Sequence, residues 1–388
     1  MSEVVILGVG MIPFGRHPQK LLVEMAAEAA RAALKDAAVE PGEVGAGFFS
    51  NGLAARLFSD HTIGQNVYWE VGINRIPIYN IENACTSAST AFCLACGQVA
   101  AGQVEVAMVV GAEKMYVPEL GLIHSGQSEL DTQLGLVAPA GFALRAKRHM
   151  AEFGTTEAQL AAVAVKNRRH AALNPNAQFR DPITPEDVLS APMVVDPLTR
   201  LQCCPNADGA AAVVLASADF ARWRRGASRG KVRPVDVRAA VYCTGSYANP
   251  QDLTHWETDE RGCRLAYEAA GVGPEDLNVV ECHDAFTISE ILHYEALGLC
   301  PAGEGGRLAE AGETALGGRI PVNPSGGLLS RGHPPGATGA AQLCEIVAQL
   351  RGEAGPRQVP GARVGLAHCM GGDKAADSKS CTVVVLSV

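Results

Sequence analysis

Four thiol or imidazole side chains spread along this 388-residue sequence could together carry out chemistry. The first, Cys85, follows a short strand-like segment and begins a run of small residues, a pattern that predicts a helix starting near this thiol. Free N–H groups and the positive end of a helix dipole favour thiolate over thiol at such a position. Cys85 is therefore a candidate nucleophile, and the alternative is a small residue chosen for tight helix packing.

The second candidate, His333, lies in the glycine- and proline-rich segment 323–339. Such a composition predicts an irregular, rigid backbone, and the prolines at 334 and 335 suit the entry to a following helix. An imidazole held on a loop of this kind can take a proton from a thiol. The alternative is a loop histidine that only hydrogen-bonds to the backbone.

Two further positions follow strand-like segments in the second half of the chain. His283 ends the segment 278–282 and could donate a hydrogen bond to a substrate carbonyl, unless it is simply a strand-end histidine. Cys369 is followed by Gly371 and Gly372, which allow a ligand close to the backbone and can present N–H groups as an oxyanion hole. The alternative is a plain strand–loop–strand hairpin.

Other patterns exclude several classes of function. Cys93 and Cys96 have no second pair at zinc spacing, so we predict no metal site. Gly8 and Gly10 lack the third glycine of a dinucleotide-binding loop. A formal charge of −9 argues against nucleic acid as a partner. The absence of an apolar stretch of about 18 residues argues against a membrane span.

Two further features of the sequence concern the location of the protein. The first residues lack a basic region and read as a strand instead of a signal peptide. Twelve cysteines in a chain without a secretion signal predict reduced thiols and a cytoplasmic location.

The elements that must position these side chains alternate between strands and helices, which predicts layered α/β architecture. Residues 37–44 resemble residues 270–277, and small-residue helices begin near Cys85 and near Gly336. Two matches in the same order predict a duplicated α/β unit. We therefore expect an N-terminal domain at 1–228, interrupted by an insertion at about 116–201, and a C-terminal domain at 229–388.

Four short blocks resemble the active-site blocks of thiolases in the same order: Asn83 to Ser87, His283 to Phe286, Gly332 to Pro334 and Cys369 to Gly372. The match spans nearly the whole chain. Within the insertion, residues 139, 142–144 and 148–150 are similar to the sterol-carrier-protein-type branch. So is His283, where the biosynthetic and degradative thiolases carry asparagine.

The resemblance implies the thiolase fold: two βαβαβαββ halves in five αβαβα layers, an inserted loop domain, and a homodimer or dimer of dimers. It implies acyl transfer with coenzyme A as co-substrate and no permanently bound cofactor. Cys85 would be acylated, His333 would activate it, and Cys369 would move a proton at the thioester Cα. His283 would polarise the thioester carbonyl, and the N–H groups of Cys85 and Gly371 would form an oxyanion hole. Residues that contact coenzyme A are not assigned by these blocks.

Two positions depart from the family pattern. Ala285 replaces a cysteine that the sterol-carrier type often has, which leaves that role to Cys369. Asp373 stands where a further glycine is usual, and could alter the pocket or a partner contact. Two other functions stay open: a retro-aldolase working with a small zinc-ribbon/OB-fold partner, and a non-catalytic scaffold or lipid-binding subunit. The retained thiols and imidazoles favour acyl transfer.

Overall fold

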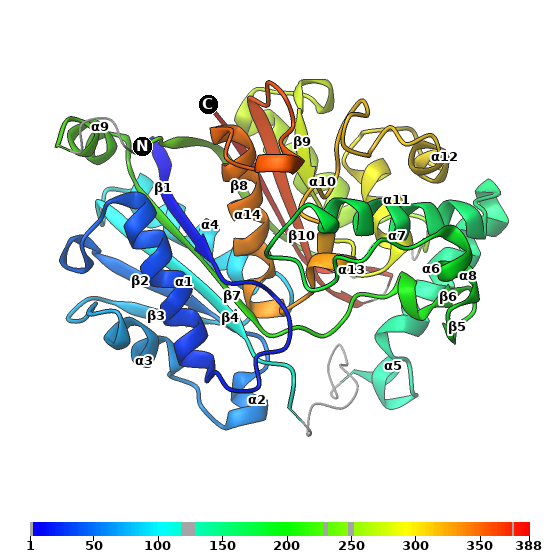
Figure 1. Cartoon of the computed structure of the whole chain (residues 1–388), viewed down its shortest axis with the longest axis horizontal. Coiled ribbons are helices and arrows are strands. Elements are labelled where there is room, and N and C mark those ends of the chain that lie inside the picture. The colour runs from blue at the N-terminus through cyan, green and yellow to red at the C-terminus, as the bar shows by residue number, and fades with distance from the viewer. Residues whose placement is uncertain (1–2, 118–128, 228–231, 247–251, 375) are drawn as a thin grey trace.

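The computed structural model describes residues 3–117, 129–227, 232–246, 252–374 and 376–388 (Figure 1). The apolar runs of the first half form fully or largely buried strands, as continuous hydrophobic segments do when helices cover both faces. These strands are β1 (Val4–Met11), β2 (Ala46–Ser50), β4 (Val106–Glu113) and β7 (Gly209–Ser217), with the more exposed β3 (Ile78–Ile81) at the edge. The predicted strand at the start of the chain is therefore confirmed.

The second half adds four strands: β8 (Val235–Thr244), β9 (Val279–Glu281), β10 (Val364–Lys374) and β11 (Asp377–Ser387). All nine form a single sheet in the order β3-β2-β4-β7-β1-β8-β11-β10-β9. The two halves join where β1 pairs with β8 through only two residue pairs. Each half thus keeps its own set of strands on its own side of this junction.

The strand order confirms the predicted repeat. Counted outward from the junction, β1-β7-β4-β2 in the first half corresponds to β8-β11-β10-β9 in the second. The repeated segments form matching 3₁₀ turns, at Pro41–Glu43 before β2 and at Pro274–Asp276 before β9. The counterpart of β3 is reduced to one parallel bridge between Val280 and Val322.

Four long helices complete the layers: α1 (Leu22–Ala37), α4 (Ser87–Ala100), α10 (Glu257–Ala270) and α14 (Pro335–Arg351). Helices α4 and α14 pack against each other between the halves, whereas α1 and α10 cover the outer faces (Figure 1). The contact needs small residues, because a Cβ on Gly339 would lie 2.7 Å from the backbone N of Ser89. Each half of the sheet thus forms one β layer, between an outer helix and the central pair α4 and α14, and the expected five-layer αβαβα arrangement is confirmed.

The insertion between β4 and β7 contains α5 (Leu130–Gln133), α6 (Ala138–Phe153), α7 (Glu157–Ala172), α8 (Pro185–Ser190) and the hairpin β5 (Met193–Val195) with β6 (Leu198–Thr199). Pro139 lies in the first turn of α6, where a proline is compatible with a helix because the N–H that it lacks would have no partner within the helix.

The remaining helices are short: α2 (Ala54–Phe58), α3 (Ile63–Glu70), α9 (Ala218–Ala227), α11 (Thr287–Ala296), α12 (Gly305–Glu310) and α13 (Gly327–Arg331). The expected domain boundary between 228 and 229 lies outside the described residues. Within the described part of the chain, no helix combines the length and apolar character needed to cross a bilayer.

Candidate active site

Cys85 lies in a tight turn between β3 and α4, two residues before the helix begins. The preceding residue, Ala84, has a φ of +48°, a left-handed conformation that non-glycine residues adopt only when their surroundings hold it. Ser87 holds it here: its hydroxyl accepts the N–H of Asn83 at 2.8 Å and donates to the carbonyl of Ala84 at 2.6 Å. The sequence predicted a helix that starts near the thiol; in the structure the helix starts at Ser87.

The structure places the imidazole of His333 against the Cys85 thiol. His333 Nε2 lies 3.2 Å from Cys85 Sγ, and Nδ1 lies 2.8 Å from the hydroxyl of Thr338. That hydroxyl donates its hydrogen to the carbonyl of Pro334 at 2.9 Å, so it can only accept from the ring. Nδ1 therefore carries the ring hydrogen, and Nε2 offers a lone pair to the thiol.

Burial keeps this pair uncharged. It raises the pKa of the Cys85 thiol to about 12, and the carboxylate of Glu113 acts in the same direction, whereas the cysteine's own N–H opposes it. Burial also lowers the pKa of His333 to about 3, with Arg331 as a second cause. The tendency toward thiolate expected at a helix start is therefore opposed by desolvation, which is the largest cause of the raised pKa of Cys85. The sulfur becomes nucleophilic only as its proton moves to Nε2.

His283 and Cys369 complete the group. Cys369 Sγ lies 3.1 Å from the carbonyl oxygen of Cys85 and 3.5 Å from His283 Nδ1. The rings of His283 and His333 meet edge to face, with centroids 5.2 Å apart. Cys85 Sγ and one ring nitrogen of each histidine all lie within 4.8 Å of one another. Four residues from four segments thus converge on one point, although up to 284 positions separate them.

The glycine block lies inside strand β10 and not in the loop that the sequence suggested. Gly371 pairs with Ser380 of β11, and a Cβ at position 371 would lie 2.4 Å from Ser380 Oγ and 2.6 Å from Thr86 Oγ1. The same added atom would lie 3.0 Å from the carbonyl oxygen of Asn83. Only glycine lets the backbone of β10 come this close to the turn that carries Cys85.

Three residues to which the sequence analysis gave no role also shape the site. Thr338 fixes the His333 tautomer, as described above. Asp284 accepts the N–H groups of Leu328 and Leu329 at 2.7 and 3.2 Å and so anchors α13, which leads to His333. Glu113 is fully buried, and its pKa is raised to about 7 by that burial. Two signals in the sequence could have indicated them. Glu113 is a charged residue at the end of an apolar strand, and Thr338 lies in the first helical turn after two prolines.

A second group of buried titratable side chains lies next to Cys369 in the chain. His368 Nε2 is 2.6 Å from Asp259 Oδ1, and the ring of His293 lies 4.3 Å from that of His368. Two ligands of a tetrahedral zinc ion would stand about 3.3 Å apart at ordinary metal–ligand distances. The separation between His368 and Asp259 is that of a strong hydrogen bond.

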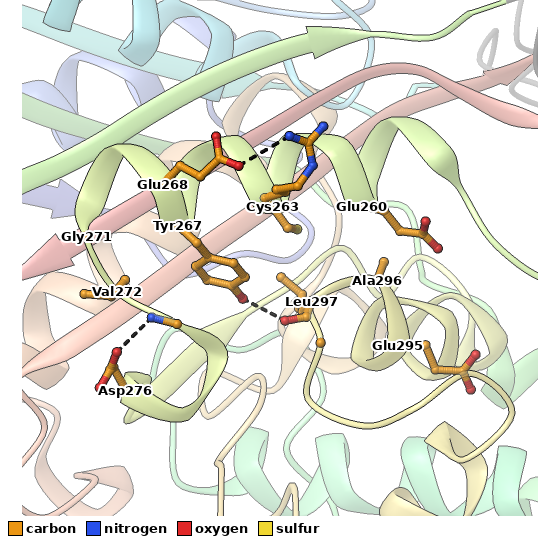
Figure 2. Close-up of a pocket in the computed structure, with 13 residues that line it drawn as sticks. Glu260, Cys263, Tyr267, Glu268, Gly271, Val272, Asp276, Glu295, Ala296 and Leu297 are labelled. Carbon is orange, nitrogen blue, oxygen red and sulfur yellow. Dashed lines mark hydrogen bonds and ion pairs between the residues drawn. The ribbon is translucent and has the colours of Figure 1, made fainter.

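A surface hollow of about 510 Å³ lies elsewhere, between α10 and the end of α11 (Figure 2). Its floor includes Tyr267, whose hydroxyl donates to the carbonyl of Leu297 at 2.7 Å. Acidic side chains, including Glu260 and Glu295, surround it. None of the predicted site residues lines this hollow, so we do not assign it to the chemistry of Cys85.

Comparison with known proteins agrees with the four blocks. The family description "Thiolase, N-terminal domain" matches residues 4–219, and "Thiolase C-terminal domain-like" matches residues 240–386. An acetyl-CoA acetyltransferase of Methanothermobacter thermautotrophicus is 40% identical over 96% of this chain and 97% of its own. The benzoylsuccinyl-CoA thiolase subunit BbsB of Thauera aromatica is 40% identical over 95% of each chain.

Two other relatives place the chain more finely. Human sterol carrier protein 2 is 37% identical over 96% of this chain and 70% of its own. The solved structure of an Ltp2-ChsH2(DUF35) aldolase superposes with a TM-score of 0.81 at 26% identity, over 98% of this chain and 97% of that one. Together with the family matches over both halves, these findings show that the chain belongs to the thiolase family, on the side of its sterol-carrier-protein-type branch.

Proposed function

We propose that the protein is an acyltransferase that moves an acyl group between Cys85 and coenzyme A. It would cleave a 3-oxoacyl-CoA with free CoA, or run the reverse Claisen condensation. The contact between Cys85 Sγ and His333 Nε2 at 3.2 Å carries this proposal, since it joins a nucleophile to a base of defined tautomer. The thiolase relatives at 40% identity support it.

In the first half of the cleavage, Cys85 gives its proton to His333 Nε2 and its sulfur attacks the 3-oxo carbonyl carbon. The N–H groups of Cys85 and Gly371 hold the resulting oxyanion. The carbon–carbon bond between Cα and the 3-oxo carbon then breaks, which leaves on Cys85 an acyl group shortened by two carbons and releases the enolate of acetyl-CoA. His283 donates a hydrogen bond to the enolate oxygen, and the Cys369 thiol protonates Cα.

In the second half, coenzyme A enters and its thiol gives a proton to the Cys369 thiolate. The CoA sulfur attacks the acyl group on Cys85, the carbon–sulfur bond to Cys85 breaks, and the leaving sulfur recovers its proton from His333. Both cysteines end in their starting states. Since Ala285 supplies no thiol, Cys369, 3.5 Å from His283 Nδ1, is the group proposed to serve Cα. Condensing two thioesters is the less favourable direction, so we propose cleavage in the cell.

The test is the covalent adduct. Wild-type protein is incubated with a panel of 3-oxoacyl-CoA esters and analysed by peptide mass spectrometry, and thioester absorbance is followed after CoA is added. We expect an acyl mass on the Cys85 peptide and CoA-dependent turnover, both lost in Cys85→Ala. Unmodified Cys85 across the whole panel, or unchanged turnover in the variant, would contradict the proposal.

The Ltp2-ChsH2(DUF35) neighbour gives the lyase alternative a specific basis, since that protein is an aldolase with a second component. The retained Cys85, His333, His283 and Cys369 support acyl transfer instead. Retro-aldol cleavage of a 3-hydroxyacyl-CoA without any adduct on Cys85 would favour the lyase. A small zinc-ribbon/OB-fold partner is compatible with either activity, and co-purification of a small zinc protein would test it.

We also propose a homodimer or dimer of dimers, two domains divided near residue 228, and a cytoplasmic location. The family resemblance supports the assembly, and light scattering on the purified protein tests it. The twelve free cysteines support a reducing compartment.

A further inference from the structure

Asp373 connects the glycine block to the inserted segment. It lies two residues beyond Gly371 on β10, at the position where the family pattern usually has another glycine. Its Oδ2 accepts hydrogen bonds from Nε and Nη2 of Arg145, at 3.1 and 3.0 Å. Since Arg145 belongs to α6, this ion pair joins the inserted helices to the strand that carries the candidate oxyanion hole.

Arg145 is fully buried, and all five of its N–H groups are used. Beyond the two hydrogen bonds to Asp373, its guanidinium donates to three backbone carbonyls, those of Leu253 (3.3 Å), His255 (3.3 Å) and Ala376 (2.6 Å). The ring of Trp256 covers one face, 4.4 Å from Cζ. A buried cation costs several kcal/mol unless it is paired and fully hydrogen-bonded, so this arrangement holds a single geometry.

The far end of the connection reaches the nucleophile. Ser380, opposite Gly371 on β11, has its hydroxyl 3.1 Å from the Gly371 carbonyl and 2.6 Å from the hydroxyl of Thr86. Thr86 in turn donates to the carbonyl of Asn83 at 2.7 Å. A continuous path of contacts therefore runs from Arg145 through Asp373 and Gly371 to the turn that carries Cys85.

We infer that the Arg145–Asp373 ion pair is a positioning device that holds the Gly371 backbone at its working distance from Cys85. Asp373 touches no reacting atom in this assignment; it acts through the backbone of the glycine block. The inference rests on the proposed function, because it gives a role to the oxyanion hole. The ion pair also explains why an acidic residue at position 373 is compatible with an intact site. Through it, the inserted segment is coupled to the proposed oxyanion hole.

The test compares Asp373→Asn with a matched control, Asp36→Asn. Asp36 also pairs with a buried arginine, since Arg351 Nη1 lies 2.7 Å from its Oδ2, and both aspartates are partly exposed, at 36% and 25%. The control therefore loses the same charge from the same kind of pair, but on α1. Steady-state thiolysis, acyl-adduct formation and thermal unfolding are measured on both variants and on the wild type.

For Asp373→Asn we expect a loss in kcat of about 10- to 100-fold, less than the roughly 10²- to 10³-fold loss on removing an oxyanion-hole donor outright, because the Gly371 N–H is displaced and not deleted. KM for CoA should change less than about threefold. Asp36→Asn should keep wild-type kcat even if both variants melt at a similarly lowered temperature. Unchanged kcat in Asp373→Asn, or an equal loss in the control, would overturn the inference.

Hydrogen exchange supplies a second readout that does not depend on turnover. Peptides covering residues 366–372 and 83–90 should exchange faster in Asp373→Asn than in the wild type, and be unaffected in Asp36→Asn. Unaltered exchange in these peptides would also overturn the inference. If the wild-type protein formed no acyl adduct, the proposed function would fail, and the exchange comparison would still decide on the positioning role.

Discussion

The tautomer of His333 offers the sharpest test of the site. Thr338→Val removes the only acceptor of the Nδ1 hydrogen among the residues that the structure describes, while nearly preserving side-chain volume. In the wild type that hydroxyl lies 2.8 Å from Nδ1 and donates its own hydrogen to the Pro334 carbonyl, so its acceptor role is fixed. The variant must either bury an unpaired N–H or move the hydrogen to Nε2, where the base is lost.

The magnitude follows from the hydrogen bond. Leaving a buried donor unsatisfied costs about 1–3 kcal/mol, and His333 is only 7% exposed. The competent tautomer would lose that much against the incompetent one, so the rate of Cys85 acylation should fall by roughly 5- to 150-fold. Thr338→Ser keeps the acceptor and should retain at least about half of the wild-type rate.

The assay is a single-turnover experiment in which release of the first product and the acyl mass on Cys85 are followed together. Thr287→Val is the matched control, because the buried hydroxyl of Thr287 has no hydrogen-bond partner among the described residues. Its acylation rate should equal that of the wild type. The reasoning is refuted if Thr338→Val acylates within twofold of the wild type, or if Thr338→Ser is impaired as severely as the valine variant.

Three further predictions concern the same site. The pKa of His333 is lowered to about 3 and that of Cys85 is raised to about 12. Neither group should therefore change its charge near neutral pH, and the pair should stay a thiol beside a neutral imidazole. The acylation rate should then be independent of pH from about pH 5 to 9. The ultraviolet absorbance of the wild type minus that of Cys85→Ser should show no thiolate over this range. A thiolate that titrates below pH 7 would contradict a neutral pair. Gly371→Ala should lower kcat at least about tenfold, since the added methyl group would lie 2.4 Å from the Ser380 hydroxyl oxygen. The control is Gly97→Ala, because Gly97 lies on α4 with open space around its Cβ position. This variant should leave kcat unchanged and stabilise the fold by about 1 kcal/mol. Cys369→Ala should slow deuterium exchange at Cα of an acyl-CoA by about 10²- to 10⁴-fold, while acylation of Cys85 by an activated ester whose leaving group needs no proton persists. Equal losses in both reactions would contradict the assignment of Cys369 to Cα.

Much of the fold was predictable because its signals are local. The apolar runs that became β1, β4 and β7 needed no knowledge of their neighbours to be recognised as buried strands. The repeat was visible in residues 37–44 and 270–277, and the same repeat appears in the order of the strands. The packing of helix α6 was not predictable in this way, because Arg145 on that helix contacts Leu253 and Asp373, more than one hundred positions away.

The four site residues could also be named from the sequence, although their charge states could not. A helix start next to Cys85 suggested a thiolate, and the structure instead has a neutral pair, since burial raises the pKa of the thiol and lowers that of its partner. Desolvation depends on everything packed around a group, and no spacing in the chain encodes it.

The sequence by itself determined the alternation of elements, their duplication, and which thiols and imidazoles stand where strands and helices end. Only the tertiary structure decided which atoms meet. It brings Cys85 and His333 into contact across 248 positions, fixes the imidazole tautomer through Thr338, and joins Asp373 to Arg145 across 228 positions. Hydrogen bonds act over about 3 Å and depend on direction, so their partners are set by how the layers pack and not by local sequence.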